Sequence, residues 1–401
     1  MRVFIAGLDG YLGWPLTLHL IAKGHYVGGI DNFSRRSWVK EVGSHSAIPI
    51  FSIEERFQAI EDLYHQRPTF FQGNLCDYQF VKFAINEFKP DVIIHLGECP
   101  SAPYSMIDVE HAIFVQMNNI VSTFNLLYSI KELDPQIHLI KLGTMGEYGT
   151  PNIRIPEGFI EIDYQGRSDL LPFPRQAGSW YHWSKVHGSN NIMFAVRIWG
   201  LRATDIMQGV VFGTQIDEMQ NNPFLATRLD FDQAFGTVIN RYCCQAVVQH
   251  PLTPYGIGHQ KRGFIPLRDS IQCLTLAIEN PCPPGEYRVL NQFADVYDVT
   301  ELAEKVYKIA TEIGIKIEIQ NVENPRKELE EHYYAPTVSK LFELGYKPSI
   351  SLDAELRIML NDLVPHKNRI LECANVLIPD IRWDGRRVRV DTFGKANPHQ
   401  T

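Results

Sequence analysis

The sequence predicts an α/β protein built on a doubly wound parallel sheet, with a smaller C-terminal region. Two observations support this fold class: short apolar runs alternate with amphipathic stretches in the first half of the chain, and a glycine-rich turn follows the first apolar run. Apolar strands that alternate with helices form βαβ units, and their parallel strands are buried on both faces. With 401 residues, the chain is long enough for one such domain and a second region.

The predicted strands are apolar runs bounded by Gly, Asn or Asp, at residues 2–8, 26–31, 69–75, 91–97 and 138–144. The amphipathic stretches that predict helices include residues 12–23, 79–88 and 112–132. From about residue 205 the pattern breaks into shorter pieces rich in Pro and Gly, which we expect to fold over the carboxyl edge of the sheet. The predicted division assigns residues 1–205 to the first domain, with 238–280 returning to it, and residues 206–237 and 281–401 to a substrate-binding region.

The bulk composition narrows the possible functions. A net charge of −8 gives no basic surface for nucleic acid or anionic lipid, so neither nucleic acid nor a membrane is an expected partner. The N-terminus lacks a signal-peptide pattern, no apolar run has the length of a membrane span, and seven cysteines form no CxxC pair. These features predict a cytoplasmic protein. The fourteen histidines show no HExxH spacing, so no metal site is expected.

Three glycines in "AGLDGYLG", Gly7, Gly10 and Gly13, follow the first predicted strand and open the first helix. Glycines at these positions allow a tight turn, let the backbone approach a pyrophosphate and bring the helix close to the strand, as in a Rossmann-type fold. Asp31 ends the second predicted strand, where its carboxylate would accept hydrogen bonds from a ribose diol. The alternative is an ordinary turn followed by a surface aspartate.

The same stretch bears on the choice of cofactor. Asp31 would repel a 2′-phosphate, which favours NAD over NADP, whereas Arg35 and Arg36 in "DNFSRR" could neutralise such a phosphate. The residues alone therefore leave this choice open. Other residues of the turn and of the second strand's end that we expect at the cofactor are Asp9, Tyr11 and Asn32.

Tyr181 and Lys185 in "SWYHWSKVHGSNN" form a YxxxK pattern at helical spacing. Four residues apart on a helix, the two side chains share one face, so the ammonium can lower the pKa of the phenol and hold a nicotinamide ribose. Thr144 lies at the carboxyl end of the fifth predicted strand, where open α/β sheets bind ligands, and can hydrogen-bond the same sugar hydroxyl. The alternative is a turn threonine and a surface Tyr–Lys pair.

In this order, the GxxGxxG turn, Asp31, the "NN" at 118–119, Thr144, Tyr181 and Lys185 resemble the extended short-chain dehydrogenase/reductase family of nucleotide-sugar enzymes. Longer strings resemble one branch of that family, the UDP-sulfoquinovose synthases. These strings are "GECPSAPYSMID" (97–108), "KLGTMGEYGTPN" (141–152), "YHWSKVH" (181–187), "RATDIMQGVVFG" (202–213) and "NPRKELEEHYY" (324–334). The resemblance runs from residue 2 to about residue 350.

The resemblance implies an enzyme that combines UDP-glucose with sulfite and uses NAD without net redox change. Oxidation at C4 of the glucose acidifies the C5 proton, water is lost across C5 and C6, sulfite adds at C6, and the ketone is reduced again. Thr144, Tyr181 and Lys185 would serve the C4 steps. The resemblance also implies a homodimer, in which two long helices of each subunit, near 107–131 and 181–198, form the interface.

Sugar 4,6-dehydratases, which this chain also resembles, carry Thr-Asp-Glu where this chain has Thr144 followed by Met and Gly. The acid and base of that class are therefore absent. Our hypothesis gives their work at C5 and C6 to His182 or Glu147, with Met145 lining the pocket for C6. Alternatively, a neighbouring backbone group satisfies His182, and Glu147 holds its loop through backbone N–H groups.

A diphosphate calls for arginine, which binds it in a bidentate manner. By resemblance, Arg262 and Arg326 would bind the phosphates of UDP, with His332 in the same string as Arg326, and Gln208 would lie near the sugar. Further residues that the resemblance assigns to the cofactor are Asn118, beside the nicotinamide half, and Asn74 and Leu75, at the end of the third predicted strand.

One departure from the resemblance concerns the sulfite donor. Pro100 stands where sulfolipid-type relatives carry an arginine that could contact the substrate or the donor. Sulfite could arrive free or from a partner protein. Two other functions fit the same motifs: a UDP-hexose 4-epimerase or 4,6-dehydratase, which needs no sulfite, and a non-catalytic NAD-sensing protein. The complete set of Thr144, Tyr181 and Lys185 argues against the sensing protein.

Overall fold

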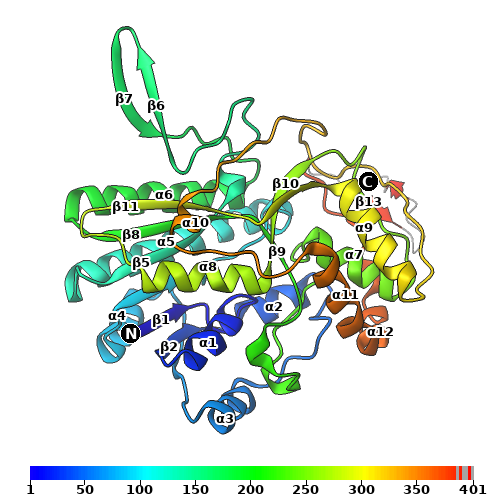
Figure 1. Ribbon diagram of the computed structural model, residues 1–401, viewed down its shortest axis with the longest axis horizontal. Coiled ribbons are helices and arrows are strands. Elements are labelled where there is room, and N and C mark those ends of the chain that lie inside the picture. Colours follow the sequence, from blue (N-terminus) through cyan, green and yellow to red (C-terminus); the bar gives the residue numbers. More distant parts are fainter. Residues whose placement is uncertain (385–387, 391–395, 399–401) are drawn as a thin grey trace.

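The computed structural model describes residues 1–384, 388–390 and 396–398. At its centre lies a seven-stranded sheet in which every neighbouring pair of strands is parallel (Figure 1). The strand order is β11-β8-β5-β4-β1-β2-β3. The strands are β1 (Arg2–Ala6), β2 (Tyr26–Asp31), β3 (Thr69–Gln72), β4 (Val92–His95), β5 (His138–Thr144), β8 (Arg202–Gln208) and β11 (Tyr287–Gln292). The order reverses direction at β1, so a crevice for a ligand opens at the carboxyl ends of β1 and β4.

Helices cover both faces of this sheet because alternate residues of each strand point to opposite faces. In β1, Val3 and Ile5 pack into the core under α1 (Gly13–Ala22) and α8 (Leu267–Glu279). Phe4 and Ala6 pack on the other side, under α4 (Tyr78–Phe88), α5 (Val109–Leu133) and α6 (Trp180–Trp199). The predicted fold class is confirmed: the sheet is parallel, doubly wound and buried on both faces.

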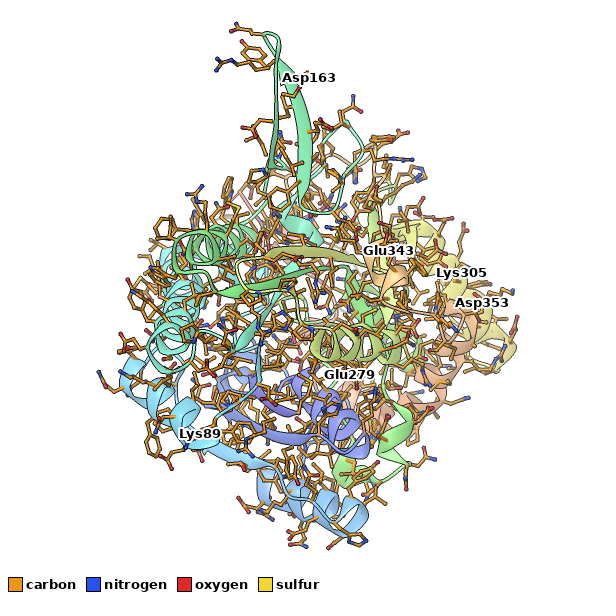
Figure 2. All side chains as sticks on the ribbon, turned by 60° about the vertical axis from the view of Figure 1, so that its left-hand side comes forward. Lys89, Asp163, Glu279, Lys305, Glu343 and Asp353 are labelled. Carbon is orange, nitrogen blue, oxygen red and sulfur yellow. The ribbon has the colours of Figure 1, made fainter. Side chains whose placement is uncertain are left out.

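The remaining helices after β2 are α2 (Ser34–Glu41) and α3 (Ile53–Tyr64). Beyond β8 the chain builds a smaller region around a three-stranded sheet. Its strands are β9 (Val210–Phe212), β10 (Lys261–Pro266) and β12 (Asp295–Asp298), and its helices are α7 (Val238–Val247), α9 (Val299–Glu312), α10 (Lys340–Glu343), α11 (Leu352–Leu363) and α12 (Lys367–Leu371). The apolar faces of α7, α9 and α11 share one core. Lys305 of α9 donates to Asp353 of α11 at 3.1 Å, and the two face each other in Figure 2.

The chain crosses repeatedly between the two sheets. β11 pairs with β8 in the main sheet, although it falls in the range predicted for the substrate-binding region. α8 packs on α1 beside the main sheet, whereas α7, from the same predicted returning segment, packs on α9 and α11. The division into a first domain and a substrate-binding region, with the boundaries given above, therefore stays a prediction. Within the described part of the chain, no helix combines the length and the apolarity that a membrane span would need.

A two-stranded hairpin projects from the body of the molecule (Figure 1). It is formed by β6 (Phe159–Tyr164) and β7 (Arg167–Pro172). Gln165 and Gly166 connect the strands with φ angles of 50° and 76°, which the turns of two-residue hairpin loops require. Asp163, near the tip, is labelled in Figure 2. The segments on either side of the hairpin run back to the edge of the main sheet.

Candidate active site

A cavity of about 680 Å³ lies at the carboxyl edge of the main sheet, where the second region folds against it. Cofactor and substrate sites of this size are typical of such edges. Most residues predicted for the site line this cavity: Gly7, Gly10, Tyr11, Gly13, Asp31, Asn32, Arg35, Asn74, Leu75, Asn118, Thr144, Met145, Tyr181, His182, Lys185, Gln208, Arg262 and Arg326. Four predicted residues are not among the lining residues: Asp9, Arg36, Glu147 and His332.

The glycine turn fits a dinucleotide. Gly7 has a φ of +98°, and a Cβ added there would lie 2.7 Å from the backbone nitrogen of Gly97. At Gly13, the first residue of α1, a Cβ would lie 2.1 Å from the carbonyl oxygen of Gly7. Any side chain would break this turn, so the bare backbone and the start of α1 face the cavity, as binding of a pyrophosphate requires.

Asp31, at the end of β2, lines the same cavity. Its two carboxylate oxygens accept the N–H groups of Asp9, at 2.9 Å, and Phe33, at 2.7 Å. Burial, together with the nearby charge of Asp9, raises the pKa of Asp31 to about 6. Because each carboxylate oxygen keeps a second lone pair, Asp31 is held in place and can still accept from a ribose diol.

The pairing of the arginines answers the question of NAD or NADP. Arg36 donates twice to Asp9, at 2.7 and 2.8 Å, and Arg56 donates to the same carboxylate at 2.5 Å. Arg35 donates to the buried Asp230 at 2.9 Å. Because carboxylates already neutralise both predicted arginines, the residues beside the adenosine position fit NAD better than NADP. Asp9, predicted at the cofactor, instead fixes Arg36 and Arg56 behind the turn.

Thr144, Tyr181 and Lys185 meet at the cavity from the end of β5 and the start of α6. The Lys185 ammonium donates to Glu98 and, at 2.7 Å, to the carbonyl oxygen of Leu142. Its nitrogen lies 5.8 Å from the ring centre of Tyr181. Burial raises the pKa of the Tyr181 phenol, and the Glu98 charge adds to this rise. All three residues line the cavity. The expected lowering of the phenol pKa by the ammonium is outweighed by burial.

His182 fills the space next to residue 146. Its Nδ1 hydrogen-bonds Ser179 Oγ at 2.9 Å, and a Cβ added to Gly146 would lie 2.4 Å from its Nε2. Desolvation lowers the pKa of His182 to about 3, and the nearby Arg326 and Arg262 contribute. The imidazole is therefore neutral at pH 7, and its Nε2 lies against the loop that follows Thr144.

Glu147 does not line the cavity, and its own fully buried side chain joins a polar cluster. Its carboxylate lies 3.2 Å from Lys141 Nζ and 3.2 Å from Arg175 Nη1, and it accepts from Ser189 Oγ at 2.9 Å. It also accepts the backbone N–H of Thr144 at 3.3 Å. The structure does not bring this carboxylate to the cavity, and these contacts match the supporting role that the sequence had left open.

Of the residues predicted for UDP and its sugar, the two arginines and His332 belong to the second region, whereas Gln208 ends β8 of the main sheet. Arg262 Nη2 donates to Glu328 at 2.6 Å, and His332 Nε2 lies 3.4 Å from Arg262 Nη1, behind the cavity wall. The Arg326 guanidinium stacks on Trp383 at 5.4 Å from the ring centre. Gln208 donates to Ser270 Oγ and Gln292 Oε1, both at 2.9 Å.

Among the lining residues that were not predicted, two are buried and charged, Arg241 and Glu98. Arg241 of α7 is 4% exposed and hydrogen-bonds the Tyr255 hydroxyl, and within residues 1–384 no carboxylate forms an ion pair with it. Arg241 could have been recognised in the sequence as a cation within the apolar run "VINRYCCQAVV", because a buried arginine needs a partner of opposite charge. Glu98 follows β4 and holds Lys185. In the sequence, Glu98 could have been recognised as a carboxylate that directly follows an apolar strand.

Position 100, where the resemblance leads us to expect an arginine, has an uncharged proline. Pro100 lines the cavity. Its neighbour Cys99 is fully buried, and burial raises the pKa of the thiol to about 12, so this cysteine is an inert thiol at neutral pH.

The sequence matches the NAD dependent epimerase/dehydratase family over residues 3–291. It is 47% identical over 384 residues to the UDP-sulfoquinovose synthase of Sulfolobus acidocaldarius, covering 96% of this chain and 98% of that protein. It is 46% identical over 392 residues to the chloroplastic UDP-sulfoquinovose synthase of Spinacia oleracea, covering 98% of this chain and 81% of that protein.

Solved structures share the fold at low identity. The UDP-glucose 4-epimerase of Thermotoga maritima aligns with a TM-score of 0.68 at 18% identity, over 92% of this chain and 99% of that one. A UDP-glucuronic acid 4-epimerase of Bacillus cereus aligns with a TM-score of 0.67 at 19% identity, over 90% and 99%. The chain belongs to the NAD-dependent epimerase/dehydratase family and, within it, to the UDP-sulfoquinovose synthases.

Proposed function

We propose that this protein forms UDP-sulfoquinovose from UDP-glucose and sulfite, with NAD reduced and re-oxidised in each turnover. The observation that carries the proposal is the position of His182, whose imidazole takes the space that a side chain at Gly146 would need. The proposed site therefore combines the residues for oxidation at C4, Thr144, Tyr181 and Lys185, with a neutral imidazole in place of the acid and base carboxylates of the dehydratases. The identity of 47% to a UDP-sulfoquinovose synthase supports the same reaction.

The first step uses residues at the end of β5 and on α6. Tyr181 takes the proton of the C4 hydroxyl, Thr144 orients that hydroxyl, and Lys185 stabilises the phenolate. NAD, when bound, would supply the hydride chemistry at C4 in both directions. Asp31 and the glycine turn hold the cofactor so that it stays bound between the two transfers.

His182 then moves protons at C5 and C6. Once C4 is a ketone, Nε2 takes the acidic C5 proton and gives it to the departing C6 hydroxyl, which leaves as water. A pKa lowered to about 3 makes the imidazolium a strong acid that gives up this proton readily, and it makes the imidazole a weak base, which takes the C5 proton only because the C4 ketone acidifies it. Bisulfite then adds through sulfur at C6, and its proton returns to C5 through the same nitrogen. Met145, at the cavity wall, is the proposed neighbour of C6.

Arginines are the proposed ligands of the UDP diphosphate. Arg326 lines the cavity beside Trp383, and the buried Arg241 gains a counter-charge when an anion binds. Arg262 is already paired with Glu328, so a phosphate has to compete with that carboxylate. Bound UDP-glucose would therefore draw the loop that carries Glu328 and Arg326 into a new arrangement.

A homodimer is the proposed assembly. α5 and α6 pack side by side and expose large apolar side chains, which an interface would cover. On α5 these are Val109, Ile113, Met117, Phe124 and Tyr128, and on α6 they are Trp180, Phe194 and Ile198. We expect Met117→Glu to halve the mass measured in solution by light scattering. Tyr307→Glu, at an exposed site on α9, should keep the dimer, and a monomeric wild type would contradict the proposal.

The cytoplasm is the proposed compartment. All seven cysteines are free thiols, and six of them are buried, which suits a reducing environment.

A mass measurement tests the proposed reaction. The purified protein is incubated with UDP-glucose, with and without sulfite, and the products are identified by their masses. A sulfonated UDP-hexose that forms only with sulfite supports the proposal. A keto sugar or UDP-galactose formed equally well in both samples would assign a dehydratase or an epimerase instead. No product with NAD still bound would assign a sensing protein. Tyr181→Phe serves as the inactive control.

A further inference from the structure

A buried carboxylate stands directly behind the catalytic lysine. Glu98 lies at the carboxyl end of β4, is 4% exposed and lines the cavity. One carboxylate oxygen accepts from the Lys185 ammonium, and the other, Oε1, is buried without a hydrogen-bond partner in the described part of the chain. Since no backbone N–H or hydroxyl shares its charge there, Lys185 is the principal counter-charge of Glu98.

Glu98 stays ionised in this position. Burial raises the pKa of Glu98, but nearby positive charge, that of Lys185 above all, outweighs it, and the net result is a lowered pKa. His95 itself is held neutral, because burial lowers its pKa to about 4. The full negative charge of Glu98 therefore faces the ammonium that the reaction needs.

The charges around Tyr181 come from four elements. Lys141 from β5 favours the phenolate, and Lys185, on the same helix α6, holds its ammonium 5.8 Å from the ring centre of Tyr181. Glu98 from β4 opposes the phenolate, as does Glu147 from the loop after β5. Cys99, next to Glu98, is an uncharged thiol at neutral pH because burial raises its pKa to about 12. Lys141 and Glu147 are ion-paired at 3.2 Å, with Asp205 and Arg175 as further partners. The pair of Glu98 and Lys185 is the one that lines the cavity with Tyr181.

We propose that Glu98 is a positioning residue that fixes the Lys185 ammonium and partly cancels its charge, so that Tyr181 becomes a base only at a higher pH. The inference rests on the proposed function, because it concerns the C4 oxidation step. The carbonyl oxygen of Leu142 alone could hold Lys185 in place. A second, charged partner therefore changes the strength of the base as well as the position of the lysine.

The test isolates the first half-reaction. Purified protein with NAD is mixed with UDP-glucose in the absence of sulfite, and the rate of cofactor reduction is followed at each pH by its absorbance. We expect Glu98→Gln to move the acid limb of this rate to lower pH by about one unit, the usual effect of one nearby charge. Glu98→Asp keeps the charge and should keep the wild-type limb with a lower maximal rate.

Glu41→Gln is the matched control. It removes one carboxylate charge from α2, outside the lining of the cavity, where Glu41 accepts from the Tyr104 hydroxyl at 2.7 Å. Its acid limb should stay with that of the wild type.

Equal acid limbs in wild type and Glu98→Gln would overturn the inference, and so would a rate that falls by the same factor at every pH, as a merely structural residue would give. If Glu98→Gln does not fold, a shifted limb in Glu98→Asp would also overturn it. Failure of the proposed function looks different: the wild type would form no sulfonated product in the mass measurement, whether or not it reduces its cofactor with UDP-glucose.

Discussion

The imidazole of His182 and the Cα of Gly146 are in such close contact that a Cβ on residue 146 would lie 2.4 Å from His182 Nε2. Only glycine leaves room for the ring at this point. The imidazole of His182 can occupy this space because residue 146 has no side chain. A carboxylate at residue 146 and the observed position of the imidazole therefore exclude each other. The same contact places His182 Nε2, from the first turn of α6, beside the proposed position of the sugar carbons C5 and C6.

Replacing Gly146 should disturb this contact directly. We expect Gly146→Ala to cost about 1–3 kcal/mol of unfolding free energy, as overpacking does, and to abolish sulfonation because the ring is displaced. Denaturant unfolding and the product assay measure the two effects. Gly178→Ala is the stability control, because a Cβ there meets no atom within 4 Å. A Gly146→Ala protein with wild-type stability and turnover would contradict the prediction.

Removing the imidazole should separate the two halves of the reaction. His182→Gln should still reduce the bound cofactor with UDP-glucose, but should lose at least about a hundredfold in exchange of the C5 proton with solvent, the lower range for a lost general base. Deuterium incorporation read by mass spectrometry measures the exchange. His187→Gln, on an exposed position of the same helix, should exchange normally. Unchanged exchange in His182→Gln would rule out the assigned base.

The buried cluster around Glu147 predicts a stability effect instead of a purely catalytic one. Glu147→Gln removes the carboxylate that pairs with Arg175 and leaves Lys141 with Asp205 alone, at 3.6 Å, so we expect a loss of about 3–5 kcal/mol of unfolding free energy. Urea unfolding measures this loss. Glu343→Gln, at an exposed position on α10 (Figure 2), should change it little. A Glu147→Gln protein of full stability that had lost only C5 exchange would restore a catalytic role.

The affinity for NAD should depend on pH through Asp31. Its pKa is raised to about 6, so below this pH the free protein holds the carboxyl protonated, whereas ribose hydroxyls donate to the ionised form. Binding then has to release a proton, and the affinity should fall by up to about tenfold for each pH unit below 6. Calorimetric titration at several pH values measures this slope.

Asp31→Asn should bind NAD more weakly and with little pH dependence. Asp232→Asn is the control, because burial also raises the pKa of Asp232 to about 6 while its carboxylate accepts the backbone N–H groups of Ala234 and Phe235 instead. It should keep the slope of the wild type. A slope that persists in Asp31→Asn would assign the pH dependence to another group.

The parts of the site that short patterns specify could be read from the sequence. The GxxGxxG turn depends on backbone clearance within a few residues, and Tyr181 and Lys185 share a helix face because of their spacing. Thr144 and Asp31 lie at the ends of apolar strands, and the edge of a parallel sheet brings such ends together. The resemblance to the UDP-sulfoquinovose synthases rested on long strings of the same kind and is confirmed by the relatives.

Only the tertiary structure decided where the polar side chains between these motifs point. Glu147 turns inward because Lys141 and Arg175, from β5 and from the segment before α6, offer buried charge partners. Asp9 leaves the cavity for Arg36 and Arg56 for the same reason. A charged side chain follows its counter-charge once both leave water, and these partners are distant in the sequence. The chain alone therefore determines the fold and the motifs, and the packing decides the roles of the charges around them.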